Sequence, residues 1–148
     1  MIENLSRKQI KAMFDALPFQ MVFIDENDKI QWWNESRARL MEAPTDRLGK
    51  DVRHCHKPES LPRLEKMLSD FKTGKAGEAE FWVTVEEIGL KALNRFFAIR
   101  DPEGNYLGTM EYLLNFGYIE QIAEEKKGAH VFQSSPANYS RTSQDPSP

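Results

Sequence analysis

The sequence predicts an α+β domain, in which a five-stranded antiparallel sheet carries helices on one face and is flanked by an N-terminal and a C-terminal helix. Three observations predict this fold class. Five β-favouring segments occur along the chain, and the last three follow one another closely. Apolar residues at helical spacing occur before, between and after these segments. At 148 residues the chain is long enough to bury one core of its own.

An N-terminal amphipathic helix is predicted within residues 1–17. Ser6 and Gln9 have the spacing of a capping box, in which each side chain satisfies a free backbone amide of the first turn. Pro18 ends the helix. The apolar residues at helical spacing are Ile10, Met13, Phe14 and Leu17.

A β-hairpin is predicted next. Residues 19–24 and 29–33 are apolar and β-favouring, and the acidic segment 25–28 between them is typical of a turn. This turn lacks the spaced oxygen ligands and the glycine of a calcium loop, so calcium binding is not predicted. Asn34 is a candidate N-cap for a short helix that continues through Met41.

The second half of the chain begins with a longer helix, predicted from Pro58 to Phe71 and stopped by Gly74. Because Pro62 is tolerated only near a helix start, the helix is expected to begin after Pro58. Strands follow at residues 79–85, 93–100 and 106–114, and a helix follows at residues 116–126.

The chain therefore divides into four segments. Residues 1–17 form the N-terminal helix, residues 18–115 the main domain and residues 116–127 the C-terminal helix. Residues 128–148 are rich in Ser, Pro, Thr, Asn and Gln, and this composition predicts a disordered tail because it cannot bury enough apolar area.

Both faces of the predicted sheet carry large apolar side chains. Neighbours in a strand point to opposite faces, so Trp32 and Trp33 are separated, as are Phe96 and Phe97. A wet face would be polar, so something is expected to cover the second face. The two candidates are the N-terminal helix and a partner subunit, and the second candidate predicts a homodimer.

Composition limits the function classes. A net charge of −3 gives no general affinity for nucleic acid or for anionic lipid, so neither is a predicted partner. Apolar runs of membrane-spanning length and the apolar core of a signal peptide are both missing from the sequence. A single cysteine excludes an internal disulfide and fits a reducing compartment. These observations predict a cytoplasmic protein.

The ordered set of motifs resembles the PAS domain family over about residues 12 to 115. The segments that carry the resemblance are Leu17-Pro18 leading into Met21–Asp25, Ile30–Asn34, Gly49–Val52, Phe97–Asp101 and Tyr106-Leu107-Gly108. The sequence further resembles a bacterial and archaeal subgroup found with hemerythrin-like regions, which has a Cys-His-Pro-Pro-type segment and a Glu-Phe-Trp run. Here these read Cys55-His56-Lys57-Pro58 and Glu80-Phe81-Trp82, with Lys57 replacing the first proline.

The resemblance implies a sensory fold that encloses a small pocket. Relatives bind heme, flavin or small organic ligands there, or bind nothing. The flavin photosensor class fits poorly, because its reactive cysteine lies in an Asn-Cys-Arg segment, whereas Cys55 lies between two histidines.

The candidate ligand-binding segment is therefore His54-Cys55-His56. An imidazole is a good ligand for heme iron and a thiolate is an alternative, and local spacing favours His56 as the metal ligand. Zinc would need three or four ligands that are not bunched in one segment. The alternative is structural: a buried cysteine and a hydrogen-bonded histidine that shape a turn. The expected pocket walls include Phe23, Leu64, Leu68 and Phe97.

The predicted function is that of a stand-alone PAS sensory module that binds heme or another small ligand and acts in trans on an unidentified partner. The alternative is a PAS interaction module that dimerises without a cofactor. An enzyme is not predicted, because no nucleophile and base from separate segments are evident and Gly74–Gly77 lacks the spacing of a phosphate loop.

Overall fold

The computed structural model describes residues 2–40, 45–85 and 90–127. The predicted helix end at Met41 and the predicted tail at residues 128–148 lie outside the described residues.

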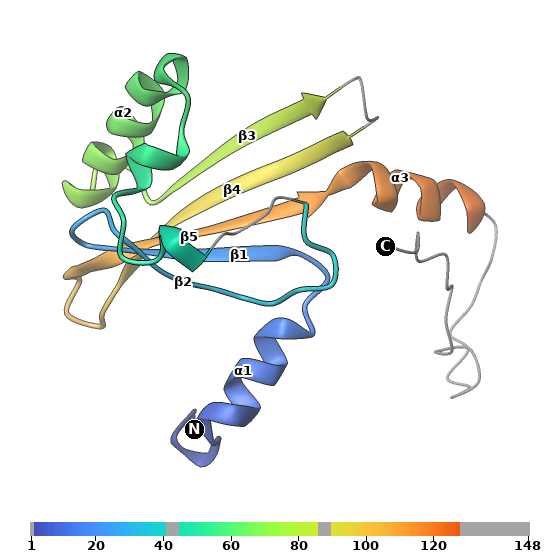
Figure 1. Cartoon of the computed structure of the whole chain (residues 1–148), viewed down its shortest axis with the longest axis horizontal. Coiled ribbons are helices and arrows are strands. Elements are labelled where there is room, and N and C mark those ends of the chain that lie inside the picture. The colour runs from blue at the N-terminus through green and yellow to red at the C-terminus, as the bar shows by residue number, and fades with distance from the viewer. Residues whose placement is uncertain (1, 41–44, 86–89, 128–148) are drawn as a thin grey trace.

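The predicted five-stranded antiparallel sheet is confirmed (Figure 1). The strands lie in the spatial order β2-β1-β5-β4-β3, so the N-terminal hairpin pairs with the last strand of the chain. Every pairing in the sheet is antiparallel. The strands are β1 Gln20–Asp25, β2 Ile30–Trp33, β3 Glu78–Val85, β4 Leu90–Arg100 and β5 Tyr106–Asn115.

Three α-helices accompany the sheet: α1 Arg7–Asp15, α2 Leu61–Lys72 and α3 Phe116–Glu125. The capping box of α1 is confirmed, since the Gln9 amide donates to Ser6 Oγ at 3.2 Å and the Ser6 amide donates to Gln9 Oε1 at 2.8 Å. Short 3-10 turns at Val52–Cys55 and Pro58–Ser60 precede α2, so the long helix begins after Pro58, as Pro62 predicted.

The short helix predicted from Asn34 is wrong for the residues that the structure describes, because residues 34–40 form no helix. Asn34 is fully buried and uses its side chain for other partners. Its Oδ1 accepts from the Met21 amide at 2.7 Å, and its Nδ2 donates to the carbonyls of Phe14 and Phe19. Asn34 therefore fastens the chain between α1 and β1 to the end of β2.

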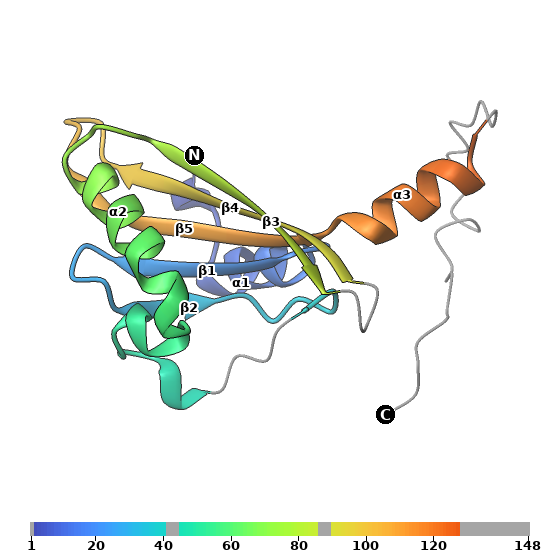
Figure 2. The same ribbon diagram turned by 90° about the horizontal axis from the view of Figure 1, so that it is seen from above.

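The core lies between α2 and one face of the sheet, which we call the inner face. Leu64, Met67, Leu68 and Phe71 of α2 are buried against Ile24, Ile30, Trp33 and Phe96 of the sheet. Helix α1 lies on the opposite, outer face, where the Phe14 ring packs edge-on against Trp32 (Figure 2). The N-terminal helix thus covers part of the second apolar face.

The backbones of the paired strands β1 and β5 lie very close together at Gly108. Gly108 has φ +148°, and a Cβ atom at this position would lie 2.2 Å from the Ile24 carbonyl oxygen. Only glycine allows this approach of the two backbones. In the part of the chain that the structure describes, no helix is both long and apolar enough to cross a bilayer.

Candidate functional site

A cavity of about 140 Å³ opens between α2 and the inner face of the sheet. Its apolar walls are Leu64 and Met67 of α2, Phe81 of β3 and Phe96 of β4. Its polar lining residues are His56, Ser60, Arg63 and Asn94. The cavity therefore joins a mostly hydrocarbon wall to a few polar groups, as small-molecule sites do.

The turn that carries His56 is built by its neighbours. Asp51 caps it, because Asp51 Oδ1 accepts from the Arg53 amide at 2.9 Å. Val52 is buried and anchors the turn in the core. The His56 Nδ1 atom lies 2.9 Å from the Val52 carbonyl oxygen. Since a carbonyl can only accept, Nδ1 donates this hydrogen bond and Nε2 is left for another partner.

The predicted site residues fall into three groups. His56 and Leu64 line the cavity. Leu68 is buried in the core and Cys55 packs against it, whereas His54 is exposed. Phe23 and Phe97 lie on the outer face, since both pair with Met110 on neighbouring strands and paired residues share a face. The structure does not bring Phe23 and Phe97 together with His56.

Sequence reasoning missed two residues of the inner face, Asn94 and Glu111. Asn94 lines the cavity and its Nδ2 donates to Glu111 Oε1 at 2.7 Å. This bond fixes the amide, and the Asn94 Oδ1 atom is buried without a hydrogen-bond partner. The available signal was the inward-facing row Ala92, Asn94 and Phe96, in which one polar residue interrupts buried apolar ones.

The surroundings of Glu111 favour its neutral form. Burial raises the pKa of Glu111, and the Asn94 hydrogen bond and the nearby His56 only partly offset it. This raised pKa favours the neutral carboxyl, which still accepts the Asn94 hydrogen bond. Asn94 and His56 thus bring two polar side chains to the cavity wall, and Asn94 Oδ1 has no hydrogen-bond partner.

Arg53 holds the His56 turn against the rest of the fold. Its guanidinium bonds both carboxylate oxygens of Glu65 in α2 and reaches Asp51 and Asp28. Asp28, in the turn after β1, is buried and also pairs with Lys72 Nζ at 2.7 Å. The hydrogen bonds that Arg53 donates to Glu65 first, and then to Asp51 and Asp28, raise the pKa of Arg53. This network joins the His56 turn, α2 and the turn after β1.

The cavity does not fit the heme that the resemblance implied. The donor chemistry is suitable, because His56 Nε2 is free while Nδ1 is held by a carbonyl. The volume is not suitable: pockets for drug-sized ligands measure roughly 300–1,000 Å³, and heme is at least drug-sized. Among the described residues, no group of three His, Cys, Asp or Glu side chains could hold a metal ion.

Known proteins share this fold. A protein-family model described as "PAS domain" matches residues 10–117. The C-terminal domain of a protein from Streptococcus mutans is 23% identical, with a TM-score of 0.72 over 80% of this chain and 90% of that chain.

Two further structures have PAS in their descriptions. The PAS domain of a protein from Colwellia psychrerythraea is 18% identical, with a TM-score of 0.54 over 73% of this chain and 94% of that chain. The PAS domain of BvgS from Bordetella pertussis is 12% identical, with a TM-score of 0.56 over 80% and 95%. At these identities the structures establish the fold alone. No curated protein gives a significant match.

Proposed function

Since this chain belongs to the PAS domain family across residues 10–117, a family of sensory signalling modules, we propose that its signal is a small neutral ligand bound in the cavity beneath α2. The observation that carries the proposal is the buried Asn94 Oδ1 atom without a hydrogen-bond partner. Leaving a buried acceptor unpaired costs about 1–3 kcal/mol, and a ligand with an O–H or N–H group would recover that free energy.

The size and lining of the cavity narrow the ligand class. An apolar cavity of about 150 Å³ holds benzene in another protein, so about 140 Å³ suits one six-membered ring. Leu64, Phe81 and Phe96 would contact the ring. Asn94 Oδ1 would accept from its donor group. We therefore propose a single-ring alcohol or amine of the phenol class in place of the heme expected from the resemblance.

The test compares phenol with anisole, which has the same ring but no O–H donor. Isothermal titration should give at least about fivefold tighter binding of phenol, since one unpaired buried acceptor costs about 1–3 kcal/mol. Replacing Asn94 by Leu should abolish this preference, because the acceptor is lost while the branched shape of the side chain is kept.

Asn27→Leu is the matched control, because Asn27 lies in the exposed turn after β1. It should leave the preference for phenol unchanged. Equal binding of phenol and anisole to the folded wild-type protein would contradict the proposal, and so would an unchanged preference in Asn94→Leu.

The second candidate function is a cofactor-free interaction module, and the exposed side chains favour it. Trp82 on the outer face of β3 is 62% exposed, which is unusual for so large an apolar group. In both candidates the output passes to another protein in trans. Action in trans, the absence of enzymatic activity and a cytoplasmic location all stay predictions.

A further inference from the structure

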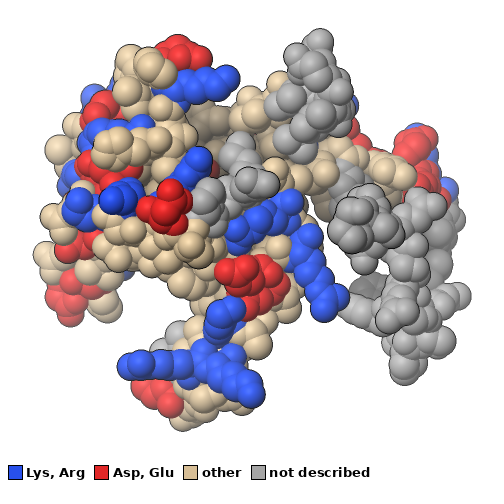
Figure 3. Space-filling model, in the orientation of Figure 1, with Lys and Arg blue, Asp and Glu red and all other residues tan. Residues whose placement is uncertain are grey.

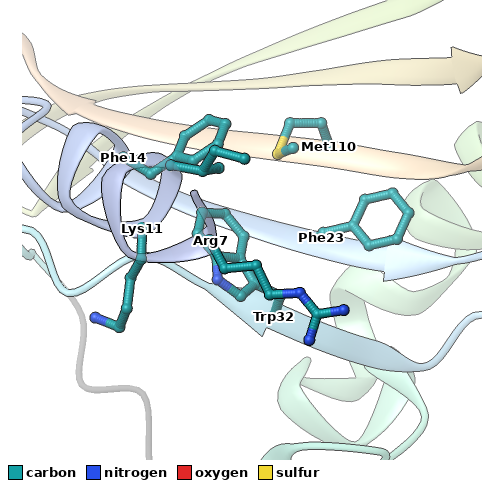
Figure 4. A pocket seen from close by; sticks show the side chains of 7 residues that line it. Arg7, Lys11, Phe14, Phe23, Trp32 and Met110 are labelled. Atoms are coloured by element: carbon teal, nitrogen blue, oxygen red, sulfur yellow. The ribbon is translucent and has the colours of Figure 1, made fainter. Parts of the chain in front are cut away.

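A second hollow lies between α1 and the outer face of the sheet (Figure 4). Its volume is about 350 Å³, more than twice that of the cavity beneath α2. The two share no lining residue and lie on opposite faces of the sheet, so a ligand in the hollow would bind independently of one in the cavity. The apolar lining of the hollow is Ile10, Phe14, Phe23, Trp32 and Met110.

The floor of the hollow is a row of side chains across three paired strands. Phe23 of β1 pairs with Trp32 of β2 and with Met110 of β5, and paired residues share a face of the sheet. The Phe14 ring forms one wall, since it packs edge-on against Trp32 with the ring centroids 5.2 Å apart. The Phe23 ring leans over Gly108, where a Cβ atom would lie 2.9 Å from Phe23 Cζ. Because glycine leaves that space to the ring, the hollow stays open between the ring and α1 (Figure 4).

Helix α1 covers the hollow only in part. None of the described residues of α1 is buried. A helix of nine residues is not stable in water by itself, so α1 depends on its contacts with the rest of the fold. A ligand between α1 and the sheet would contact both, and we therefore expect it to stabilise the helix.

The helix side of the hollow is positively charged. Arg7 and Lys11 both line it, four residues apart in one row along α1, and Lys and Arg side chains gather over this helix (Figure 3). The lining includes no Asp or Glu among the described residues. In the part of the chain that the structure describes, Arg7 forms no ion pair, and the Lys11 pair with Asp15 is a surface pair. Surface pairs are weak, so both cations are available to a ligand.

These cations do not serve the helix itself. The N-terminus of an α-helix favours acidic side chains, because its backbone amides carry partial positive charge. The first turn of α1 has no acidic residue and instead carries Arg7 and Lys8. An anion bound beside Arg7 would offset this repulsion, so the charges of the hollow indicate an anionic ligand.

We propose that the hollow binds a free medium-chain carboxylic acid in its anionic form. The alkyl chain lies on Phe23, Trp32 and Met110, and Arg7 and Lys11 hold the carboxylate by charge-assisted hydrogen bonds. An apolar cavity of about 150 Å³ holds the six carbons of benzene, so about 350 Å³ suits a chain of roughly ten carbons. The two longer chains of a membrane phospholipid exceed that volume, which favours the free acid over a lipid surface.

The test measures the binding of decanoate to the full chain by isothermal titration, below the concentration at which decanoate forms micelles. Decanoate should bind at least about a hundredfold more tightly than butyrate, since each buried methylene contributes roughly fourfold. Arg7→Gln with Lys11→Gln should weaken decanoate binding at least about tenfold, because hydrogen bonds to the charged carboxylate are lost. The same variant should bind the neutral 1-decanol as the wild type does. Bound decanoate should also slow hydrogen exchange in α1.

The matched control is Lys8→Gln with Lys50→Gln, which removes the same charge at exposed positions outside the hollow and should bind decanoate as the wild type does. Asn94→Leu, in the cavity beneath α2, should also leave decanoate binding unchanged, so this proposal and the proposed function fail separately. Circular dichroism confirms that each variant is folded.

Three results would overturn the proposal. The first is a wild-type chain that does not bind decanoate, including one that binds only vesicles of anionic phospholipid. The second is undiminished decanoate binding in Arg7→Gln with Lys11→Gln, or a loss that the Lys8 and Lys50 control or 1-decanol shows equally. The third is decanoate binding that falls only in Asn94→Leu, which would place the ligand in the cavity beneath α2.

Discussion

At the scale of single residues, Asn34 shows how much one buried side chain can organise. Its three hydrogen bonds go to backbone groups of Phe14, Phe19 and Met21, all before or at the start of β1. Asn34→Ala would leave these buried groups unpaired, and we expect a loss of about 3 kcal/mol in the free energy of unfolding, measured by urea denaturation.

The matched control is Asn27→Ala, where the exposed side chain makes only a 3.4 Å contact with Glu26. We expect a change within about 0.5 kcal/mol there. Similar losses in both variants would show that the hydrogen bonds of Asn34 contribute nothing particular. The sequence assigned Asn34 to a helix cap because asparagine favours caps; the distant partners that it satisfies instead become visible only in three dimensions.

At the scale of elements, Arg53 joins α2 to the turn after β1. Arg53→Met would remove the ion pairs with Glu65, Asp51 and the buried Asp28. The Arg53 side chain is itself 31% exposed, so solvent screening reduces the effect, and we expect a loss of about 2 kcal/mol in the free energy of unfolding. Hydrogen exchange should also rise in α2.

Lys66→Met serves as the control for Arg53, because Lys66 forms a surface pair with Asp70 four residues along the same helix. The expected change is within about 0.5 kcal/mol. Equal losses of stability in the two variants would contradict the proposed role of Arg53 in joining α2 to the turn after β1. Hydrogen exchange in α2 that stays at the wild-type level in Arg53→Met would contradict it as well. Local spacing did predict α2 itself and its late start, because those depend on neighbouring residues.

At the scale of the whole molecule, two carboxyl groups give the free energy of unfolding opposite dependences on pH. Burial raises the pKa of Glu111 in the folded state, so its stabilising contribution is complete below the unfolded pKa of about 4.3 and is lost as pH rises through the folded value. The Arg53 hydrogen bond lowers the pKa of Glu65, so that contribution is present above the unfolded pKa and is lost on acidification.

Glu111→Gln should therefore flatten the decline in unfolding free energy as pH rises above the unfolded pKa of glutamate, about 4.3. Glutamine keeps an acceptor for Asn94 and cannot ionise. Urea denaturation at several pH values measures the slope, and Glu103→Gln in the exposed turn before β5 is the control. Parallel profiles for wild type and Glu111→Gln would contradict this assignment.

The sequence by itself determined the five strands, the three α-helices and the family, because strand alternation, helical spacing and turn residues are local properties. It also separated Phe96 from Phe97, since neighbours in a strand point apart. It could not decide which of the two faces inward, because alternation along a strand does not tell which face of the sheet packs against the core. Only the tertiary structure placed Phe97 outside, and only strand pairing brought Asn94 against Glu111, 17 residues along the chain. The size of the cavity, and with it the mismatch with heme, depends on that packing.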